Sequence, residues 1–294
     1  MTVKTLLLAA LGVVTLGFVL VWVRHLRSGV GSRSADEAPA PPTLFQLIVG
    51  FGTNFFDTLG IGSYAPTTAI FKLRGMVPDE RIPGTLSVGH TLATITQAFI
   101  FMTLVEVDGI TLALMIGTAV AGAYLGAGIV SRWPRRNVQI GMGVALLAAA
   151  TLFTMNNLKI FPGGGDALAL SSTRLGVGMA GNFLLGSLMT IGIGLYAPCM
   201  ILVSLLGMNP QAAFPIMMGS CAFLMPVASV KFLEARSYSV RPALGLVLGG
   251  IPAVLIAAFI VKSLPLTMVR WLVVVVVTYS SIMMLRSAYR ERAR

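Results

Sequence analysis

The sequence Gly-Ile-Gly-Ser-Tyr-Ala-Pro at residues 60–66 recurs as Gly-Ile-Gly-Leu-Tyr-Ala-Pro at residues 192–198. Each copy lies within a long apolar stretch, where an uninterrupted helix would otherwise be expected. Glycine loses the most backbone entropy on joining a helix, and proline lacks the amide hydrogen and collides with the preceding turn. The two segments therefore predict two broken helices. In a bilayer the backbone groups freed by a break need partners from protein, water or a ligand, so a binding site is expected there.

The composition is typical of a polytopic helical membrane protein. Of the 294 residues, 56% are hydrophobic and only 11% are charged, and the mean hydropathy is +0.88. Apolar runs of about 18 or more residues, separated by short charged loops, indicate membrane-spanning helices. The net charge of +11 comes from Lys and Arg in those loops, which indicates positive-inside topology rather than a nucleic-acid-binding surface. The two cysteines and two histidines form no metal-binding motif, so no metal or cofactor is expected.

The first apolar run, residues 5–23, is followed at once by Arg24, His25 and Arg27. A cleaved signal peptide carries its positive charge before the apolar region, so this run is predicted to be a retained anchor with its N-terminus outside. An atypical signal sequence is the alternative. Six further spans are predicted, at residues 85–105, 111–130, 137–156, 214–233, 242–261 and 266–285.

The two broken segments belong to a tandem repeat. Gly60 and Gly192 lie 132 residues apart. The same offset pairs Tyr64 with Tyr196, Pro66 with Pro198, Gly75 with Gly207, Met76 with Met208, Pro78 with Pro210, and Gly117 with Gly249. Such self-similarity indicates a duplication. The predicted organisation is an N-terminal anchor and linker (1–43), a first transmembrane repeat (44–157), a linker (158–173), a second transmembrane repeat (174–285) and a cytoplasmic basic tail (286–294).

The orientation of the repeats depends on how the broken segments run. If each is a re-entrant hairpin, each repeat has three spans and the two are inverted; if each crosses once with a kink, each has four spans and the two are parallel. With the basic tail in the cytoplasm, the first alternative places the clusters at 24–33, 72–81 and 132–136 on the cytoplasmic side and Glu106 with Asp108 outside. The predicted fold class is therefore an all-α polytopic membrane protein of tandem inverted repeats, each with three spans plus a re-entrant broken helix, and an extra N-terminal span.

Each hairpin would present the start of its second half-helix near the membrane midplane, with a proline in the first turn. The first amides of a helix lack internal partners and carry the positive end of the helix dipole, so they bind anions. Two such ends would hold one small anion. The alternative is that glycine and proline only permit tight helix packing. The candidate substrate-binding residues are Gly60, Gly62, Ser63, Tyr64, Pro66, Thr67, Gly192, Gly194, Tyr196, Pro198 and Cys199.

Two ionisable residues of the first repeat are candidates for coupling transport to protons. Asp57 precedes the first break, and a carboxyl within the membrane is a functional hypothesis by default; the alternative is that it hydrogen-bonds local backbone at the hairpin tip. His90 could carry protons near neutral pH, or it could be a structural residue. The second repeat has Met189 and Ala222 at these positions, so either role belongs to the first repeat alone.

Other residues near the breaks have simpler interpretations. Asn54, Gln97 and Asn182 are polar residues within apolar runs, and interhelical hydrogen bonding explains each of them. Cys199 follows the second motif directly. Its thiol could act on a sulfur anion, although buried cysteine usually behaves as a small apolar residue.

The duplicated GIG-x-YAP segments, the following Gly-Met-x-Pro at 75–78 and 207–210, and the short basic turn between later helices resemble the sulfite exporter TauE/SafE (TSUP) family of membrane anion permeases. The resemblance covers about residues 44–285. It implies a secondary transporter, most simply an exporter, of a small sulfur-containing or organic anion such as sulfite or a sulfonate. The family pattern is richer in glycine before the first motif, where this chain has Phe55, Phe56 and Asp57.

The expected protein is thus not an enzyme but an alternating-access transporter in the plasma membrane (the inner membrane of a bacterium), with a cytoplasmic C-terminus. Its expected partners are a small anionic substrate, the lipid bilayer and protons as a coupling ion, but no nucleic acid. Whether it forms a homo-oligomer stays open. A passive anion channel is the first alternative, since a channel needs no coupling ion. A membrane-embedded enzyme or an assembly scaffold is the second, although an enzyme should show a polar catalytic cluster at one interface.

Overall fold

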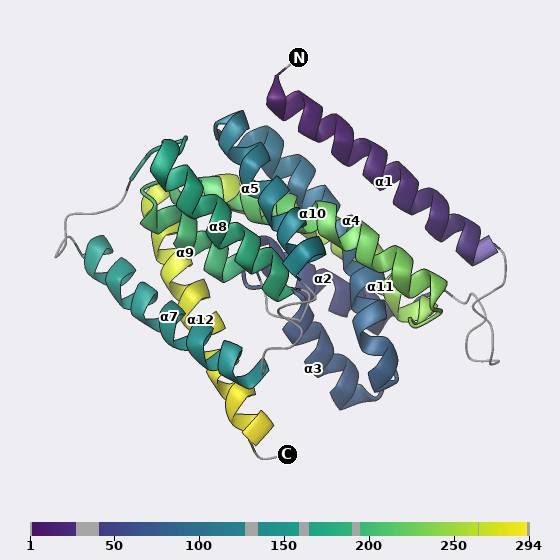
Figure 1. Ribbon diagram of the computed structural model, residues 1–294. Coiled ribbons are helices and arrows are strands. Elements are labelled where there is room, and N and C mark those ends of the chain that lie inside the picture. The colour runs from purple at the N-terminus through teal and green to yellow at the C-terminus, as the bar shows by residue number, and fades with distance from the viewer. Residues whose placement is uncertain are drawn as a thin grey trace. The chain divides into compact units, whose positions relative to one another are not determined.

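The structure is a computed structural model that describes residues 2–27, 41–126, 135–158, 165–189, 195–263 and 265–292. It is about 85% helical with no strands and 11 helices in the described residues (Figure 1), which confirms the all-α class. The helices are α1 (Val3–Arg27), α2 (Leu44–Thr58), α3 (Tyr64–Arg74), α4 (Ile82–Leu104), α5 (Gly109–Ala121), α7 (Arg135–Asn157), α8 (Ser172–Met189), α9 (Tyr196–Leu205), α10 (Ala213–Glu234), α11 (Val240–Ser263) and α12 (Leu266–Arg292).

A helix occupies the position of each predicted span: α1, α4, α5, α7, α10, α11 and α12. Helix α5 ends before the predicted span does, and the chain continues there as a π-helical turn, η3 (Gly122–Gly126). Three helical segments, Val3–Arg27, Pro210–Glu234 and Val240–Val261, are long and apolar enough to cross a membrane. The described helices are therefore compatible with a membrane-spanning protein.

Each predicted broken segment consists of two helices, α2 with α3 and α8 with α9. The order of elements also repeats: α2, α3, α4, α5 and α7 correspond at the 132-residue offset to α8, α9, α10, α11 and α12. A capping box starts the first segment, since Thr43 accepts a hydrogen bond from the amide of Gln46, whose side chain accepts from the amide of Thr43. The start of α2 thus follows a local sequence signal.

Both broken segments double back, so that the first helix begins where the second ends. In the first segment the guanidinium of Arg74, at the end of α3, lies 5.0 Å from the centre of the Phe45 ring, at the start of α2. In the second, Arg174 near the start of α8 donates to the carbonyl of Leu206, just after α9, at 3.4 Å. Each segment is therefore a helical hairpin whose open end is closed by an arginine.

The chain forms two compact units that exchange helices between the repeats. The first unit comprises mainly Thr5–Ile100 and Cys221–Ile260, and the second comprises mainly Phe101–Ser220 and Val261–Arg294. The first unit thus contains the hairpin of the first repeat and α11 of the second. The second unit contains the hairpin of the second repeat and α5 of the first, together with α7 and α12, which run side by side (Figure 1).

Glycines allow the first helix of each hairpin to approach its partner helix closely. In the first unit a Cβ atom added to Gly249 of α11 would overlap the carbonyl oxygen of Leu47 and lie 2.8 Å from the amide nitrogen of Phe51, both in α2. In the second unit a Cβ atom added to Gly186 of α8 would overlap the carbonyl of Ala119 in α5. Small residues at helix crossings are the usual means of close packing in membranes.

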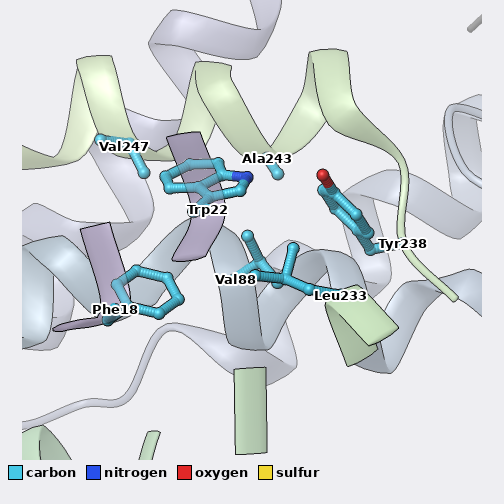
Figure 2. Close-up of a cluster of buried hydrophobic side chains, with 7 residues drawn as sticks. All are labelled: Phe18, Trp22, Val88, Leu233, Tyr238, Ala243 and Val247. Carbon is cyan, nitrogen blue, oxygen red and sulfur yellow. The ribbon is translucent and has the colours of Figure 1, made fainter. Parts of the chain in front are cut away.

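Helix α1 packs along the first unit through one face only. Figure 2 shows Phe18 and Trp22 of α1 facing a buried apolar cluster, completed by Val88, Leu233, Tyr238, Ala243 and Val247. The two aromatic rings of α1 stack with their centres 5.8 Å apart. The opposite face exposes large apolar side chains such as Val13, at 73%. An exposed face of this kind suits contact with lipid.

Within the first unit, contacts gather several basic loop regions at one end. The ring of His25, near the end of α1, lies 5.8 Å from that of Tyr238, in the loop between α10 and α11. Ser237 of that loop donates to the carbonyl of Glu80 at 3.4 Å. Arg241 donates to the carbonyl of Pro41, before α2, at 2.9 Å.

The second unit also brings loop regions together, at two places. At one end, Arg136 of α7 donates to the carbonyl of Ala288 near the end of α12, at 3.3 Å, which brings two basic segments together. At another, the amide of Asp108 donates to Leu168 at 2.8 Å and the amide of Asn209 donates to Ala167 at 2.9 Å. The loops before α5, before α8 and after α9 are therefore joined by backbone hydrogen bonds.

We predict that Gly249→Ala destabilises the protein, because the added methyl group meets backbone atoms of α2 that cannot move independently. Overpacking of this kind costs about 1–3 kcal/mol. Its counterpart at the 132-residue offset, Gly117, has nothing within 4 Å of an added Cβ atom, so Gly117→Ala is the matched control. Thermal unfolding in detergent should show a lower midpoint for Gly249→Ala only; equal midpoints for the two variants would contradict the packing.

Candidate functional site

The first break is a loop between α2, which ends at Thr58, and α3, which begins at Tyr64. Gly60 and Gly62 have φ angles of 96° and 90°, a region that side chains with a Cβ atom rarely adopt. A Cβ atom added to Gly62 would nevertheless meet nothing within 4 Å. Glycine is therefore required at Gly62 by the backbone conformation and not by crowding, and open space lies beside it.

Asp57 ties the two helices of the first hairpin together across this break. Its side chain is buried, and it accepts hydrogen bonds from both the hydroxyl and the backbone amide of Ser63. The side-chain amide of Gln97 in α4 donates to Asp57 Oδ2 at 2.8 Å and to Thr58 Oγ1 at 3.0 Å. Asp57 thus caps the start of α3 from outside the helix, in agreement with the local structural alternative.

This arrangement changes what the start of α3 can offer to an anion. The sequence predicts unpaired amides there, but the amide of Ser63, which precedes the first residue of α3, is bonded to Asp57. An anion at this amide would have to compete with a carboxyl group of the chain itself. The amide of Ser63 is therefore open to a ligand only when Asp57 releases it.

His90 of α4 is fully buried at the same break and is held through both ring nitrogens. Its Nδ1 lies 3.0 Å from Asn54 Oδ1 in α2, and its Nε2 lies 3.1 Å from Thr67 Oγ1 in α3. Thr67 also donates to the carbonyl of Ser63 at 2.7 Å. The Tyr64 ring lies 5.8 Å from the imidazole, centre to centre. Three helices therefore converge on one histidine.

Together these residues form a continuous buried polar network at the first break. We call it the break network, and its members are Asn54, Asp57, Ser63, Thr67, His90 and Gln97. The sequence singled out four of them as site candidates but interpreted Asn54 and Gln97 only as interhelical hydrogen-bonding residues. That interpretation is confirmed, and these two residues also orient the site. The signal for Asn54 was its spacing, since it lies one helical turn before Asp57.

The other candidates of the first break have lesser contacts. Tyr64 donates to Ser87 Oγ at 3.4 Å, a long hydrogen bond. Pro66 lies in the first turn of α3, as predicted. Proline is tolerated there because amide hydrogens in the first turn have no acceptor within the helix.

The second break has a different chemical character. The break network has as its counterparts Gly186, Met189, Leu195, Cys199, Ala222 and Ser229, none of which is charged. Tyr196, Pro198 and Cys199 lie in the first turn of α9 and are buried. Cys199 is 0% exposed, which is typical of an unreactive packing residue. Gly192 and Gly194 lie outside the described residues.

Polar residues of α8 bind the partner helix in the second unit. Asn182 donates to the carbonyl of Met115 in α5 at 2.6 Å, which confirms its interhelical role. Ser187 donates to the carbonyl of Gly122 at 2.8 Å. In the described part of the chain no three His, Cys, Asp or Glu residues come together as metal ligands would.

We predict that Asp57→Asn destabilises the first hairpin, because an amide brings an N–H group to where Gln97 and Ser63 already present donors. Leaving a buried donor unpaired costs about 1–3 kcal/mol. The double variant Asp57→Asn/Gln97→Glu restores complementary groups between α2 and α4 and should recover part of the loss. Thermal unfolding of the detergent-solubilised variants measures both effects. A single variant as stable as the wild type would contradict the capping role.

No protein-family model, curated protein or solved structure matches the chain. The resemblance of the duplicated motif to the TauE/SafE family accordingly stays a hypothesis. The two hairpins and the break network are the observations from which a function can be argued.

Proposed function

We propose that the protein is a secondary transporter of a small anion, in which the two helical hairpins form the moving substrate-binding elements. The observation that carries this proposal is the pair of helix breaks at matching positions of two repeats. A break in an apolar helix persists in a membrane only where it is buried in protein or lines a water-filled space. Discontinuous helices in duplicated halves are the characteristic binding elements of transporters.

The two breaks support different roles. At the 132-residue offset the second repeat has Met189 and Leu195 in place of Asp57 and Ser63, so it lacks a counterpart of the carboxyl group that would compete with an anion. The open space beside Gly62 supports ligand access at the first break as well. We propose that substrate is bound at the first break by Gly60, Gly62, Ser63, Tyr64, Pro66 and Thr67, and at the second break by Gly192, Gly194, Tyr196, Pro198 and Cys199.

We further propose seven spans and two re-entrant hairpins, with inverted repeats and a cytoplasmic C-terminus. In both hairpins an arginine joins the start of the first helix to the end of the second. These contacts support the re-entrant alternative over a kinked single crossing. The gathering of basic loops within each unit supports a common cytoplasmic side. We propose a plasma-membrane location on the resemblance, and the long apolar helices support a membrane-spanning protein.

Sulfite, sulfonates or related small anions are proposed as substrates, and export as the direction, on the resemblance to the TauE/SafE family. A passive anion channel is the second candidate function, since a channel needs no coupling group. The buried ionisable residues of the break network favour a coupled transporter over that alternative. An enzyme or a scaffold has no observation in its favour among the described residues.

The topology predicts opposite accessibility for two exposed loop positions. Ser171, between the repeats, should be external, and Ala235, after α10, should be cytoplasmic. Single cysteines at these positions should therefore react with a membrane-impermeant maleimide from opposite sides of oriented membranes. The native Cys199 and Cys221 are buried and should give little background. Labelling of both positions from the same side would contradict the inverted arrangement.

Substrate flux should depend on the backbone conformation at Gly62. Leucine there must adopt a φ angle near 90°, a strain of about 1–3 kcal/mol, which we expect to slow anion flux by about 5- to 150-fold. Gly52→Leu is the matched control, because Gly52 also has nothing within 4 Å of an added Cβ atom but lies within helix α2. Sulfite uptake into proteoliposomes measures the difference. Equal uptake by two correctly inserted variants would reject the site assignment.

A further inference from the structure

We infer that His90 is the proton-binding residue that couples anion transport to protons, with the exchangeable proton on Nε2 and with Asp57 acting as a fixed cap. This inference rests on the proposed transport function and assigns its coupling site. It also separates two candidates that the sequence leaves equivalent, an aspartate and a histidine near the same break. The direction of each hydrogen bond around the imidazole ring distinguishes the two residues.

The orientation of the Asn54 side chain fixes the proton on Nδ1 of His90. Asn54 Nδ2 donates to the carbonyl of Gly50 at 2.7 Å and lies 3.5 Å from the carbonyl of Leu246 in α11. A flipped amide would place its oxygen against two carbonyl oxygens, so Asn54 Oδ1 must face His90. An amide oxygen only accepts hydrogen bonds. His90 Nδ1, 3.0 Å away, is therefore the donor and carries a hydrogen in every charge state.

Thr67 can hydrogen-bond to His90 Nε2 whether or not that nitrogen is protonated. Its hydroxyl oxygen lies 3.1 Å from His90 Nε2 and 2.7 Å from the carbonyl oxygen of Ser63, but it has one hydrogen. When Nε2 is unprotonated, Thr67 donates to Nε2 and the ring is neutral. When Nε2 takes up a proton from solution, it donates to Thr67 Oγ1, and the hydroxyl hydrogen turns to Ser63.

Both charge states of His90 can thus be hydrogen-bonded without moving a heavy atom of these partners. A buried charge is tolerated only when it is hydrogen-bonded or paired. The imidazolium has acceptors on both nitrogens, from Asn54 and Thr67. A group that is satisfied in both states can exchange its proton during a transport cycle, whereas Asp57 is held by the hydroxyl and amide of Ser63 and the amide of Gln97.

The other titratable groups around His90 come from three helices. Asp57 of α2 belongs to the same network, Tyr64 of α3 lies against the ring, and Cys221 of α10 lies near the Tyr64 phenol. Helix α11 presents the carbonyl of Leu246 to Asn54 rather than a charged group. Asp57 is therefore the one residue of the described network that can carry a negative charge to offset the imidazolium.

Protonation would place a positive charge at the hairpin whose tip opens beside Gly62. An anion bound there would be attracted to the protonated state and repelled less by Asp57. The proton and the anion would then bind and leave together. Because the second repeat has Ala222 in place of His90, the chain has one such site, and we expect one proton for each transport cycle.

Nitrogen NMR of the ¹⁵N-histidine-labelled full-length protein tests the assignment directly. In the His25→Gln variant, His90 is the only histidine, since the chain has two. We expect the Nδ1–H tautomer at high pH and protonation of Nε2 as the pH falls. Thr67→Val should move the midpoint of this titration. An Nε2–H tautomer, or a ring that stays neutral throughout the pH range in which the protein is folded, would overturn the inference.

Anion uptake driven by a pH gradient gives a second, separable readout. We expect His90→Gln to lose the pH dependence of uptake, and Thr67→Val to shift it. Thr91→Val is the matched control: Thr91 is equally buried, donates to the carbonyl of Ser87 at 2.6 Å and lies 2.9 Å from Ser229 Oγ, outside the break network. An unchanged pH profile in His90→Gln would refute the coupling role. Titration of His90 in a protein without any anion flux would instead refute the transport function and leave the proton site standing.

Discussion

The backbone of a broken helix in an apolar protein must find hydrogen-bond partners, and the first hairpin depends on how this chain supplies them. Asp57 reaches across the break to the hydroxyl and amide of Ser63, and Gln97 holds the carboxyl from α4. The glycines supply the positive φ angles that let the loop turn back. Side chains from α2 and α4 therefore stabilise the break.

The duplication produces similar hairpins with different chemistry. Each hairpin is closed at its open end by an arginine, and the first helix of each packs against a helix of the other repeat through glycines. The break network, however, belongs to the first repeat alone. A transporter that moves an anion together with one proton needs such asymmetry, because a proton site in both halves would double the coupled charge.

Much of the fold could be predicted from residues alone. Apolar runs predicted the positions of the long helices, and the Gly-Ile-Gly and Tyr-Ala-Pro segments predicted both breaks, because these signals are local. The packing of α11 on α2, and of α5 on α8, could not be predicted. It depends on contacts between glycines and the backbone of a helix that is distant in sequence. Likewise, Asn54 and His90 are 36 residues apart, and nothing in their own neighbourhoods indicates that they hydrogen-bond to each other or that His90 also contacts Thr67 of α3.

The proposed protein is a carrier, which binds an anion on one side of the membrane at a time. Counterflow tests this most directly: proteoliposomes filled with unlabelled sulfite are diluted into a trace of radiolabelled sulfite, with no pH gradient. A carrier exchanges the two, so labelled sulfite should rise transiently inside, above its equilibrium level, and then fall. Labelled sulfite that rises only to equilibrium would indicate a channel, and either that result or the absence of uptake would contradict the account.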